Sequence, residues 1–180
     1  KYVKSNPTDI YEEIRILIKN DEKVLFIGLP CQSAGLQRYM NLKFATYSDD
    51  KNSHIKNLYT VDLICHGTPS KRTLQEFLQR QGVELKSCRD IKFRNGYFYE
   101  LSADEKSFCD TLTDQSGNTK DRYSDDFLRR INHLEGCYTC QYKRPERASD
   151  LSLGDAWGTS YSLEELRKGI SLALPMTDKG

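Results

Sequence analysis

Two short apolar runs, each followed closely by a cysteine, constrain the fold of this 180-residue chain more than any other feature. Val24–Ile27 (VLFI) leads through a glycine and a proline to Cys31, and Leu58–Ile64 (LYTVDLI) leads directly to Cys65. A continuous apolar run of this length predicts a strand that is covered on both faces, as in a parallel sheet. The chain therefore has two predicted strands of the kind found in α/β proteins.

Amphipathic segments alternate with these runs. Asp9–Asn20 carries apolar side chains at helical spacing, and Glu12 is placed to complete a capping box with the first residue of the segment. A second helix is predicted over Cys31–Met40, and a third follows an N-cap at Ser70 and runs to about Arg80. Helix, strand, helix, strand, helix is the order that predicts a parallel α/β layer.

The middle of the chain has a different pattern. Ile91–Leu101 holds Asn95-Gly96 between two strand-like runs, which is a strong hairpin signal. A strand-like stretch at Ser107–Leu112 and a turn at Gly117-Asn118 extend this hairpin to a small antiparallel meander. Asp125–Leu134 is then predicted to be a helix.

We therefore predict an α/β fold with a partly parallel sheet, flanking helices and a small antiparallel β-meander insertion. The prediction is one domain over 1–180, with the α/β core in 1–86 and 124–180 and the meander in 87–123. Neither end of the chain reads as a natural terminus, and we expect it to be a fragment of a longer protein.

Charge and hydropathy exclude some classes of protein. The 27 Lys and Arg residues nearly balance the 26 Asp and Glu residues, so no concentrated basic excess predicts nucleic acid as a partner. No apolar run approaches the ~20 residues that a membrane span needs. We expect a cytoplasmic protein.

Four of the six cysteines are placed for thiol chemistry. Cys31 and Cys65 follow the carboxyl ends of two buried strands, which is the edge where open parallel sheets bind ligands. Cys31 also stands near the start of a helix, where free N–H groups favour the thiolate. Cys137 and Cys140 form a C-x-x-C pair. Four thiolates match a Cys₄ zinc site or a 4Fe–4S cluster.

Each of the remaining candidate residues also has an ordinary structural interpretation. Cys88 and Cys109 lie in the meander and are interpreted as ordinary small, buried or half-buried residues. His66 could be a base or a neighbour of a bound cofactor, and Asp155, at another strand end, could hold a ligand hydroxyl or cap a turn. Two alternatives to the cluster remain: a zinc-stabilised Cys₄ interaction module, and an enzyme with Cys31 as nucleophile and His66 as base.

Six motifs, spread in order along nearly the whole chain, resemble the C-terminal domain family of coenzyme F420 hydrogenase/dehydrogenase beta subunits. The motifs are KYVKS (1–5), GLPCQ with AGL (28–36), CHGTPS (65–70), CYTC (137–140), DLSLGDAWG (150–158) and GISL (169–172).

The resemblance implies a flavin/iron–sulfur oxidoreductase in which a 4Fe–4S cluster lies beside FAD. The family's cluster-ligand positions correspond to Cys31, Cys65, Cys137 and Cys140, and Gln32, His66 and Asp155 are candidate cofactor-binding residues. The implied partners are a redox partner subunit or an N-terminal ferredoxin-like segment, and a small-molecule hydride carrier such as coenzyme F420.

Overall fold

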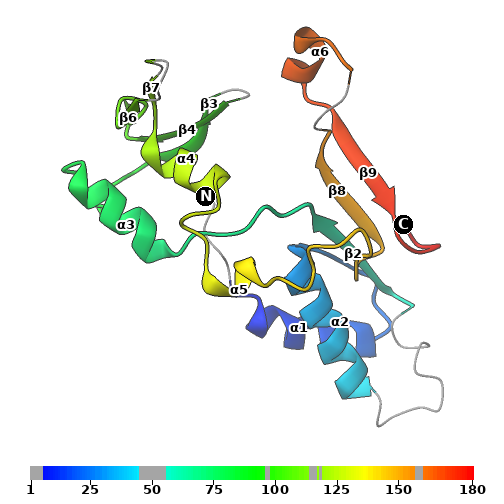
Figure 1. The fold of residues 1–180 in the computed structure, drawn as a ribbon. Helices are drawn as coiled ribbons and strands as arrows, with labels where there is room; N and C mark the ends of the chain where they lie inside the picture. The colour runs from blue at the N-terminus through cyan, green and yellow to red at the C-terminus, as the bar shows by residue number, and fades with distance from the viewer. Residues whose placement is uncertain (1–5, 45–55, 96–97, 114–116, 118, 157–159) are drawn as a thin grey trace. The chain divides into compact units, whose positions relative to one another are not determined.

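The computed structural model describes residues 6–44, 56–95, 98–113, 117, 119–156 and 160–180 (Figure 1). The described chain divides into two compact units. The sheet unit comprises residues 6–65 and 141–180, and the hairpin unit comprises residues 66–140. The predicted turn residues Gly96 and Asn118 lie outside the described residues, as do 1–5 and 157–158 of the quoted motifs.

The sheet unit is built on a four-stranded sheet with the order β1-β2-β8-β9. The strands are β1 (Val24–Gly28), β2 (Leu58–Leu63), β8 (Leu151–Asp155) and β9 (Ser171–Pro175). The first three strands are parallel, and β9 pairs antiparallel with β8. This mixed sheet confirms the predicted partly parallel α/β layer. The two apolar runs that precede Cys31 and Cys65 form β1 and β2, which are neighbouring strands.

Two helices cover one face of this sheet, α1 (Thr8–Lys19) and α2 (Pro30–Phe44), and a short helix, α6 (Leu163–Lys168), lies between β8 and β9 in the chain. Every second residue of β1 and β2 points toward the helices, so Phe26 and Leu58 lie on this face together with the buried Thr60 and Asp62. The buried core that results contains Ile14, Ile18, Phe26, Leu36, Met40, Phe44 and Leu58.

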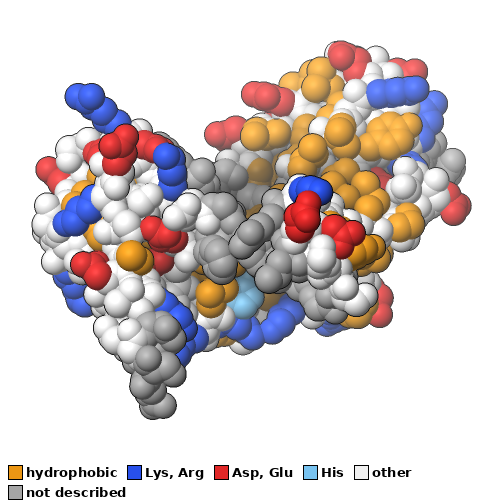
Figure 2. Space-filling view, turned by 90° about the horizontal axis from the view of Figure 1, so that it is seen from above, with side chains coloured by type: hydrophobic (Ala, Val, Ile, Leu, Met, Phe, Trp, Pro, Cys, Tyr) orange, Lys and Arg blue, Asp and Glu red, His pale blue; other side chains and the backbone are white. Residues whose placement is uncertain are grey.

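The opposite face of β1 is exposed in the described chain, whereas the apolar run predicted cover on both sides. Leu25 and Ile27 each keep 60% of their surface exposed, and they pair across the sheet with Tyr59 and Val61. Figure 2 shows that exposed hydrophobic side chains gather over a broad area of one face. The prediction of two covered faces therefore holds only for the helix side.

The hairpin unit contains small antiparallel sheets, as predicted, with helices beside them. Strands β3 (Ile91–Asn95), β4 (Phe98–Ala103) and β5 (Lys106–Ser107) form one sheet, and β6 (Leu112–Thr113) pairs with β7 (Thr119–Lys120). The helices are α3 (Lys71–Arg80), α4 (Arg122–Leu128) and α5 (Glu135–Tyr138). Its buried core consists of Leu74, Leu78, Phe93, Leu101, Ala103, Phe108 and Tyr123.

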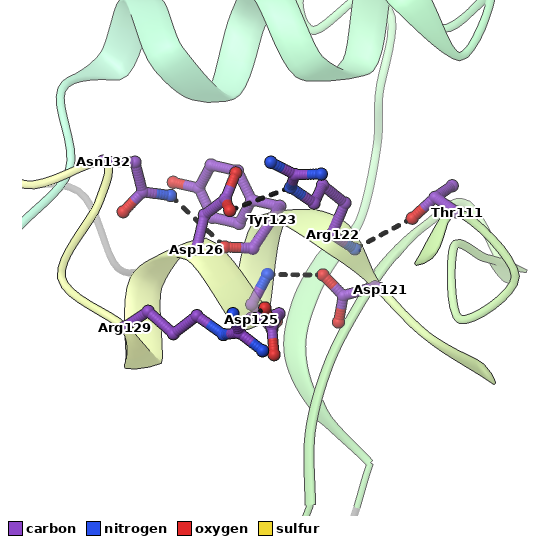
Figure 3. A network of polar contacts seen from close by, with 9 residues as sticks. Thr111, Asp121, Arg122, Tyr123, Asp125, Asp126, Arg129 and Asn132 are labelled. Carbon is purple, nitrogen blue, oxygen red and sulfur yellow. Dashed lines mark hydrogen bonds and ion pairs between the residues drawn. The ribbon is translucent and has the colours of Figure 1, made fainter. Parts of the chain in front are cut away.

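Helix α4 is held at its start by a buried carboxylate (Figure 3). Asp121, which is 3% exposed, accepts hydrogen bonds from the backbone N–H of Ser124 at 2.6 Å and of Leu101 at 3.0 Å. The first bond caps the helix, and the second joins the helix to β4. The predicted helix over Asp125–Leu134 is therefore wrong at both ends, since α4 begins at Arg122 and stops at Leu128.

One predicted cap is also wrong. Helix α1 begins after Pro7, and no side chain caps it. Glu12 instead accepts hydrogen bonds from Arg15 and Tyr39, and these bonds lower its pKa to about 2. The predicted N-cap at Ser70 is confirmed, because its hydroxyl accepts the N–H of Thr73 at 3.1 Å.

No helix in the described part of the chain is long and apolar enough to cross a membrane.

The core of the sheet unit can be tested at Leu36, which has no exposed surface. Leu36→Ala should lower the free energy of unfolding by about 2–5 kcal/mol, because it removes packed methyl groups and leaves a cavity. Leu42→Ala on the same helix, where the side chain is 69% exposed, should change it by less than about 0.5 kcal/mol. Urea unfolding followed by circular dichroism measures both. Equal losses in the two variants would contradict this core.

Candidate functional site

The parallel pairing of β1 with β2 brings two predicted site residues to one edge of the sheet. The pairs run in register from Val24 with Leu58 to Gly28 with Asp62. Cys31 therefore follows the carboxyl end of β1, and Cys65 follows the carboxyl end of the adjacent strand β2. A shared edge requires that these strands be neighbours, and the structure confirms this condition.

Cys31 is the second residue of α2 and is half-buried. The turn before it is closed by Gln32, whose Oε1 accepts the N–H of Leu29 at 2.8 Å. The backbone N–H groups of Gln32 and Ser33 both donate to the carbonyl of Leu29 at 2.8 and 2.9 Å. The thiol is thus placed in the first turn of a 15-residue helix, where the helix dipole stabilises negative charge.

Gly28 is required where the strand approaches this turn. A Cβ at this position would lie 2.7 Å from the ring of Phe26 and 3.2 Å from Oε1 of Gln32. The ring of a core residue and the side chain that closes the turn therefore occupy the space beside Gly28. Packing in the core and the position of Cys31 are coupled through this glycine.

Tyr11 lies close to the same turn. Its hydroxyl donates to the carbonyl oxygen of Gln32 at 2.6 Å. Burial, with a smaller contribution from the charge of Cys31, raises the pKa of Tyr11. The phenol therefore stays protonated at neutral pH and remains a hydrogen-bond donor beside the predicted thiolate position.

Asp155 is the third predicted residue at this edge. It is the last residue of β8, which pairs parallel with β2, and it is exposed. The strand ends are held together by a hydrogen bond from the N–H of Ile64 to the carbonyl of Leu153 at 2.7 Å. Gly154 permits the approach, because a Cβ there would lie 2.7 Å from the side chain of Ile64. Cys31, Cys65 and Asp155 thus lie at the ends of three adjacent parallel strands.

Beneath this edge lies a buried carboxylate that sequence reasoning missed. Asp62 has no exposed surface, and its two oxygens accept hydrogen bonds from the hydroxyls of Ser152 at 2.7 Å and Ser149 at 2.6 Å. The sequence contained one sign of it: an acidic residue stands inside the apolar run LYTVDLI. A carboxyl group that is buried in a strand requires hydrogen-bond partners. Its partners lie about ninety residues further along the chain.

Asp150 joins β2 and β8 near their starts. Its Oδ2 accepts hydrogen bonds from the backbone N–H of Thr60 at 2.7 Å and from the Thr60 hydroxyl at 2.9 Å. Its Oδ1 accepts the hydroxyl of Thr177 at 2.7 Å. The segment that follows the C-x-x-C pair is therefore anchored on β2 before β8 begins.

Cys137 and Cys140 lie in the hairpin unit and are half-buried. Cys137 is part of α5, and its N–H donates to the carbonyl of Leu134 at 2.9 Å. The N–H of Leu134 in turn donates to the carbonyl of Thr68 at 2.9 Å. Cys137 is therefore linked through Leu134 to Thr68 of the CHGTPS segment.

His66 belongs to an aromatic cluster in the same unit. Its ring centroid lies 5.2 Å from that of Phe127 and 5.3 Å from that of His133. Its Nε2 lies 3.1 Å from the carbonyl oxygen of Leu128. Because a carbonyl only accepts, this contact places the proton of the neutral imidazole on Nε2.

His133 is a buried member of this cluster that no sequence pattern indicates. It is 8% exposed, and neither ring nitrogen has a hydrogen-bond partner among the described residues. Burial lowers its pKa, and the neighbouring His66 and Arg130 lower it further. The imidazole is therefore neutral at neutral pH.

The predicted site residues fall into two groups. Cys31, Gln32, Cys65 and Asp155 belong to the sheet unit, and His66, Cys137 and Cys140 belong to the hairpin unit. Within the residues that the structure describes, no three His, Cys, Asp or Glu side chains are grouped closely enough to hold a metal ion. Convergence of the four cysteines therefore stays a prediction.

The two remaining cysteines differ from one another. Cys88 is half-buried, as predicted, and its thiol donates to the carbonyl of Glu84 at 3.3 Å. Cys109 is exposed, so the prediction of a buried or half-buried residue is wrong for it. It follows the buried Phe108 just beyond β5, where the chain has left the sheet.

Comparisons with known proteins identify a family. Residues 21–180 match the family described as the C terminus of the coenzyme F420 hydrogenase/dehydrogenase beta subunit. A similar solved structure is that of the F420-reducing [NiFe] hydrogenase complex from Methanosarcina barkeri, with a TM-score of 0.39 and 16% sequence identity. The match covers 86% of this chain and 52% of that one, so this chain spans about half its length. No curated protein matches.

Gly67 tests the contact between the CHGTPS segment and His133. Its φ is +135°, and a Cβ there would lie 2.4 Å from Cε1 and Nδ1 of His133. Gly67→Ala should destabilise the protein by at least ~2 kcal/mol, since backbone strain alone costs roughly 1–3 kcal/mol. Gly82→Ala, where φ is +73° and nothing lies within 4 Å, provides a milder backbone strain without the clash. Urea unfolding should separate the two variants, and equal destabilisation would contradict the close packing.

His133 predicts an acid-dependent loss of stability. Its pKa is lowered in the folded protein, so its neutral form contributes stability that is present above pH ~6.5 and lost as the pH falls through the folded value. His133→Phe should remove this contribution while staying within about 1 kcal/mol of the wild type at pH 7.5. Unfolding curves at pH 7.5 and pH 5 measure it. The same acid sensitivity in both proteins would show that His133 is not responsible.

Proposed function

Because this chain belongs to the C-terminal domain family of coenzyme F420 hydrogenase/dehydrogenase beta subunits, we propose that it is the electron-transfer part of a flavin/iron–sulfur oxidoreductase. The family is named for parts of hydrogenases and dehydrogenases, which are redox enzymes. The chain spans about half of the solved chain that it matches, so the activity of the whole protein is part of the proposal.

The observation that carries this proposal is the placement of Cys31 and Cys65 after neighbouring parallel strands. A nucleophile needs one thiol, whereas a metal ligand set needs several, and two at one sheet edge favour the ligand set. Cys137 and Cys140 supply the remaining pair, so the donor set is four thiolates. That set fits a 4Fe–4S cluster, which would supply one-electron chemistry.

The chain's own residues would prepare the thiolates. The helix dipole at the start of α2 lowers the cost of a charged sulfur at Cys31, and Gln32 keeps the turn closed around it. The protonated hydroxyl of Tyr11 lies beside this turn as a donor. Its proton is donated to the carbonyl of Gln32, so Tyr11 would hold the backbone of the turn that carries Cys31.

FAD is the second proposed cofactor, with Gln32, His66 and Asp155 as candidate contacts. Asp155 is exposed at the edge of the sheet, where a carboxylate can accept a ring N–H or a ribose hydroxyl. His66 has its proton fixed on Nε2 by the carbonyl of Leu128, so its Nδ1 carries the lone pair in the neutral form. Gln32 contributes through the turn that it closes.

The proposed partners follow from this chemistry. A redox partner subunit or an N-terminal ferredoxin-like segment would exchange single electrons with the cluster, and a small-molecule hydride carrier, coenzyme F420 or another, would exchange hydride with the flavin. The similar solved structure is described as a hydrogenase complex, which agrees with a role beside partner subunits.

Two other functions use the same residues. A zinc-stabilised interaction module would also use the four cysteines. An enzyme with Cys31 as a covalent nucleophile and His66 as base would need only one of them.

The ligand assignment is tested by Cys31→Ala in the full-length protein, purified and reconstituted anaerobically. Iron and acid-labile sulfide should fall well below the wild-type content, since a cluster held by three thiolates is labile. Cys88→Ala, which removes a half-buried cysteine outside the proposed set, should leave both contents unchanged.

Three results would contradict the proposal. Wild-type iron and sulfide in Cys31→Ala would remove Cys31 from the ligand set. A colourless protein that holds one equivalent of zinc would favour the interaction module. Selective alkylation of Cys31, with Cys137 and Cys140 dispensable for activity, would favour the nucleophile.

A further inference from the structure

The sheet unit has an open edge along β1. Among the described strands, β2 pairs with one edge of β1 and no strand pairs with the other. The N–H of Val24 donates to the carbonyl of Asn57 at 2.9 Å, and this bond fixes which residues of β1 face β2. Because the direction alternates along a strand, the backbone N–H and C=O groups of Leu25 and Ile27 point to the open edge.

An open edge can pair with a strand of another chain, and proteins commonly protect such edges with charged residues or proline. The five residues of β1 (VLFIG) include neither. Leu25 and Ile27 also keep 60% of their surface exposed, on the face of the sheet away from α1 and α2. The edge is therefore apolar and has the backbone groups that a further strand needs.

Helix α1 adds a second apolar layer at the same edge. It packs against β1, whereas α2 packs against both β1 and β2. Tyr11 of α1 donates to the carbonyl of Gln32 in α2, so this flank of α1 faces α2. Ile10 and Leu17 are seven residues apart on the opposite flank, and they are 47% and 37% exposed. They therefore lie on the side of the open edge.

The strand is complementary to a second copy of itself. When two β1 strands run antiparallel about an axis at Phe26, Leu25 of one copy lies opposite Ile27 of the other. Both residues direct their backbone groups to the edge, so each of these pairs exchanges two hydrogen bonds. The two Leu–Ile pairs then lie next to each other on the exposed face, and such apolar cross-strand pairs stabilise antiparallel strands.

The helices are complementary about the same axis. Helix α1 runs antiparallel to β1, because only residues 20–23 connect them. The midpoint between Ile10 and Leu17 lies roughly 8 Å from the end of the helix, at 1.5 Å per residue. Phe26 lies roughly 7 Å from the start of the strand, at 3.3 Å per residue. One two-fold axis can therefore pair the strands and bring Ile10 of one copy against Leu17 of the other.

We propose that the open edge of β1 and the adjoining flank of α1 form a two-fold interface with a second copy of this chain, in which the two sheets join through antiparallel β1 strands. This inference rests on the sheet unit alone and does not depend on the proposed function.

The size of the interface sets its strength. The strand is about 16 Å long and the sheet with its helix layer is roughly 20 Å high, which gives about 300–400 Å² per copy, against the ~800 Å² of a stable interface. The exposed Glu13 carboxylates of the two copies also approach each other near the axis and repel weakly. The dimer is therefore weak, with a Kd on the order of 10–100 µM.

Sedimentation velocity tests the interface on the anaerobically purified full-length protein, from about 1 to 200 µM. The wild type should shift from monomer toward dimer across this range. Ile10→Lys should weaken dimerisation by at least about tenfold, because it places a cation against the apolar flank of each partner. Ile16→Lys is the matched control: Ile16 has the same exposed fraction, 47%, but lies on the solvent side of the helix, so this variant should dimerise like the wild type.

Two variants of β1 test the antiparallel register. Leu25→Lys and Ile27→Glu should each dimerise more weakly than the wild type, because each homodimer places a charge opposite an apolar side chain. An equimolar mixture of the two should dimerise more strongly than either alone, since the new lysine of one copy lies opposite the new glutamate of the other. Both positions are 60% exposed, so the variants should fold, and circular dichroism checks this.

The outcomes are distinct. A wild type that stays monomeric throughout, or equal weakening by Ile10→Lys and Ile16→Lys, would overturn the interface. Weakened homodimers without recovery in the mixture would overturn the antiparallel register. Iron and sulfide are measured in the same samples and should not change in any variant. A wild type without a cluster would contradict the proposed function and leave the sedimentation result as the test of the interface.

Discussion

A buried carboxylate holds together the strands on which the candidate site is built. Asp62 is removed from water on β2, and the hydroxyls of Ser149 and Ser152 donate to its two oxygens. A buried carboxyl group without hydrogen-bond partners is costly, so the pairing of β2 with β8 satisfies a group that would otherwise destabilise the sheet. The site edge, with Cys65 and Asp155 at the ends of these strands, therefore depends on two hydrogen bonds in the interior of the sheet.

Much of this edge could be predicted because it follows from local patterns. The apolar runs before Cys31 and Cys65 indicate strands from the local pattern alone, and parallel strands end at a common edge. The partners of Asp62 could not be predicted, because Ser149 and Ser152 are far from it in the chain. The end of α4 was missed for a related reason: Arg130 adopts a left-handed backbone with φ of +63°, which residue type alone does not signal.

The hairpin unit shows the same limit more clearly. Its meander was predicted from turn residues, which act over a few positions. Phe93, Tyr99 and Phe127 come from β3, β4 and α4, and only the fold brings these rings together with that of Tyr123. His133 likewise has no pattern around it that would mark it as buried. Local signals specify the elements, whereas sites assembled from several elements require the tertiary structure.

Gly28 has a consequence for how the sequence of this chain can evolve. The ring of Phe26 fills the space where a side chain at Gly28 would lie, and Gln32 closes the turn on the other side. A core substitution at Phe26 would therefore be transmitted to the sulfur of Cys31 without any residue of the turn being replaced. The potential of the proposed cluster would thus respond to substitutions in a part of the sequence that lies outside the proposed ligand set.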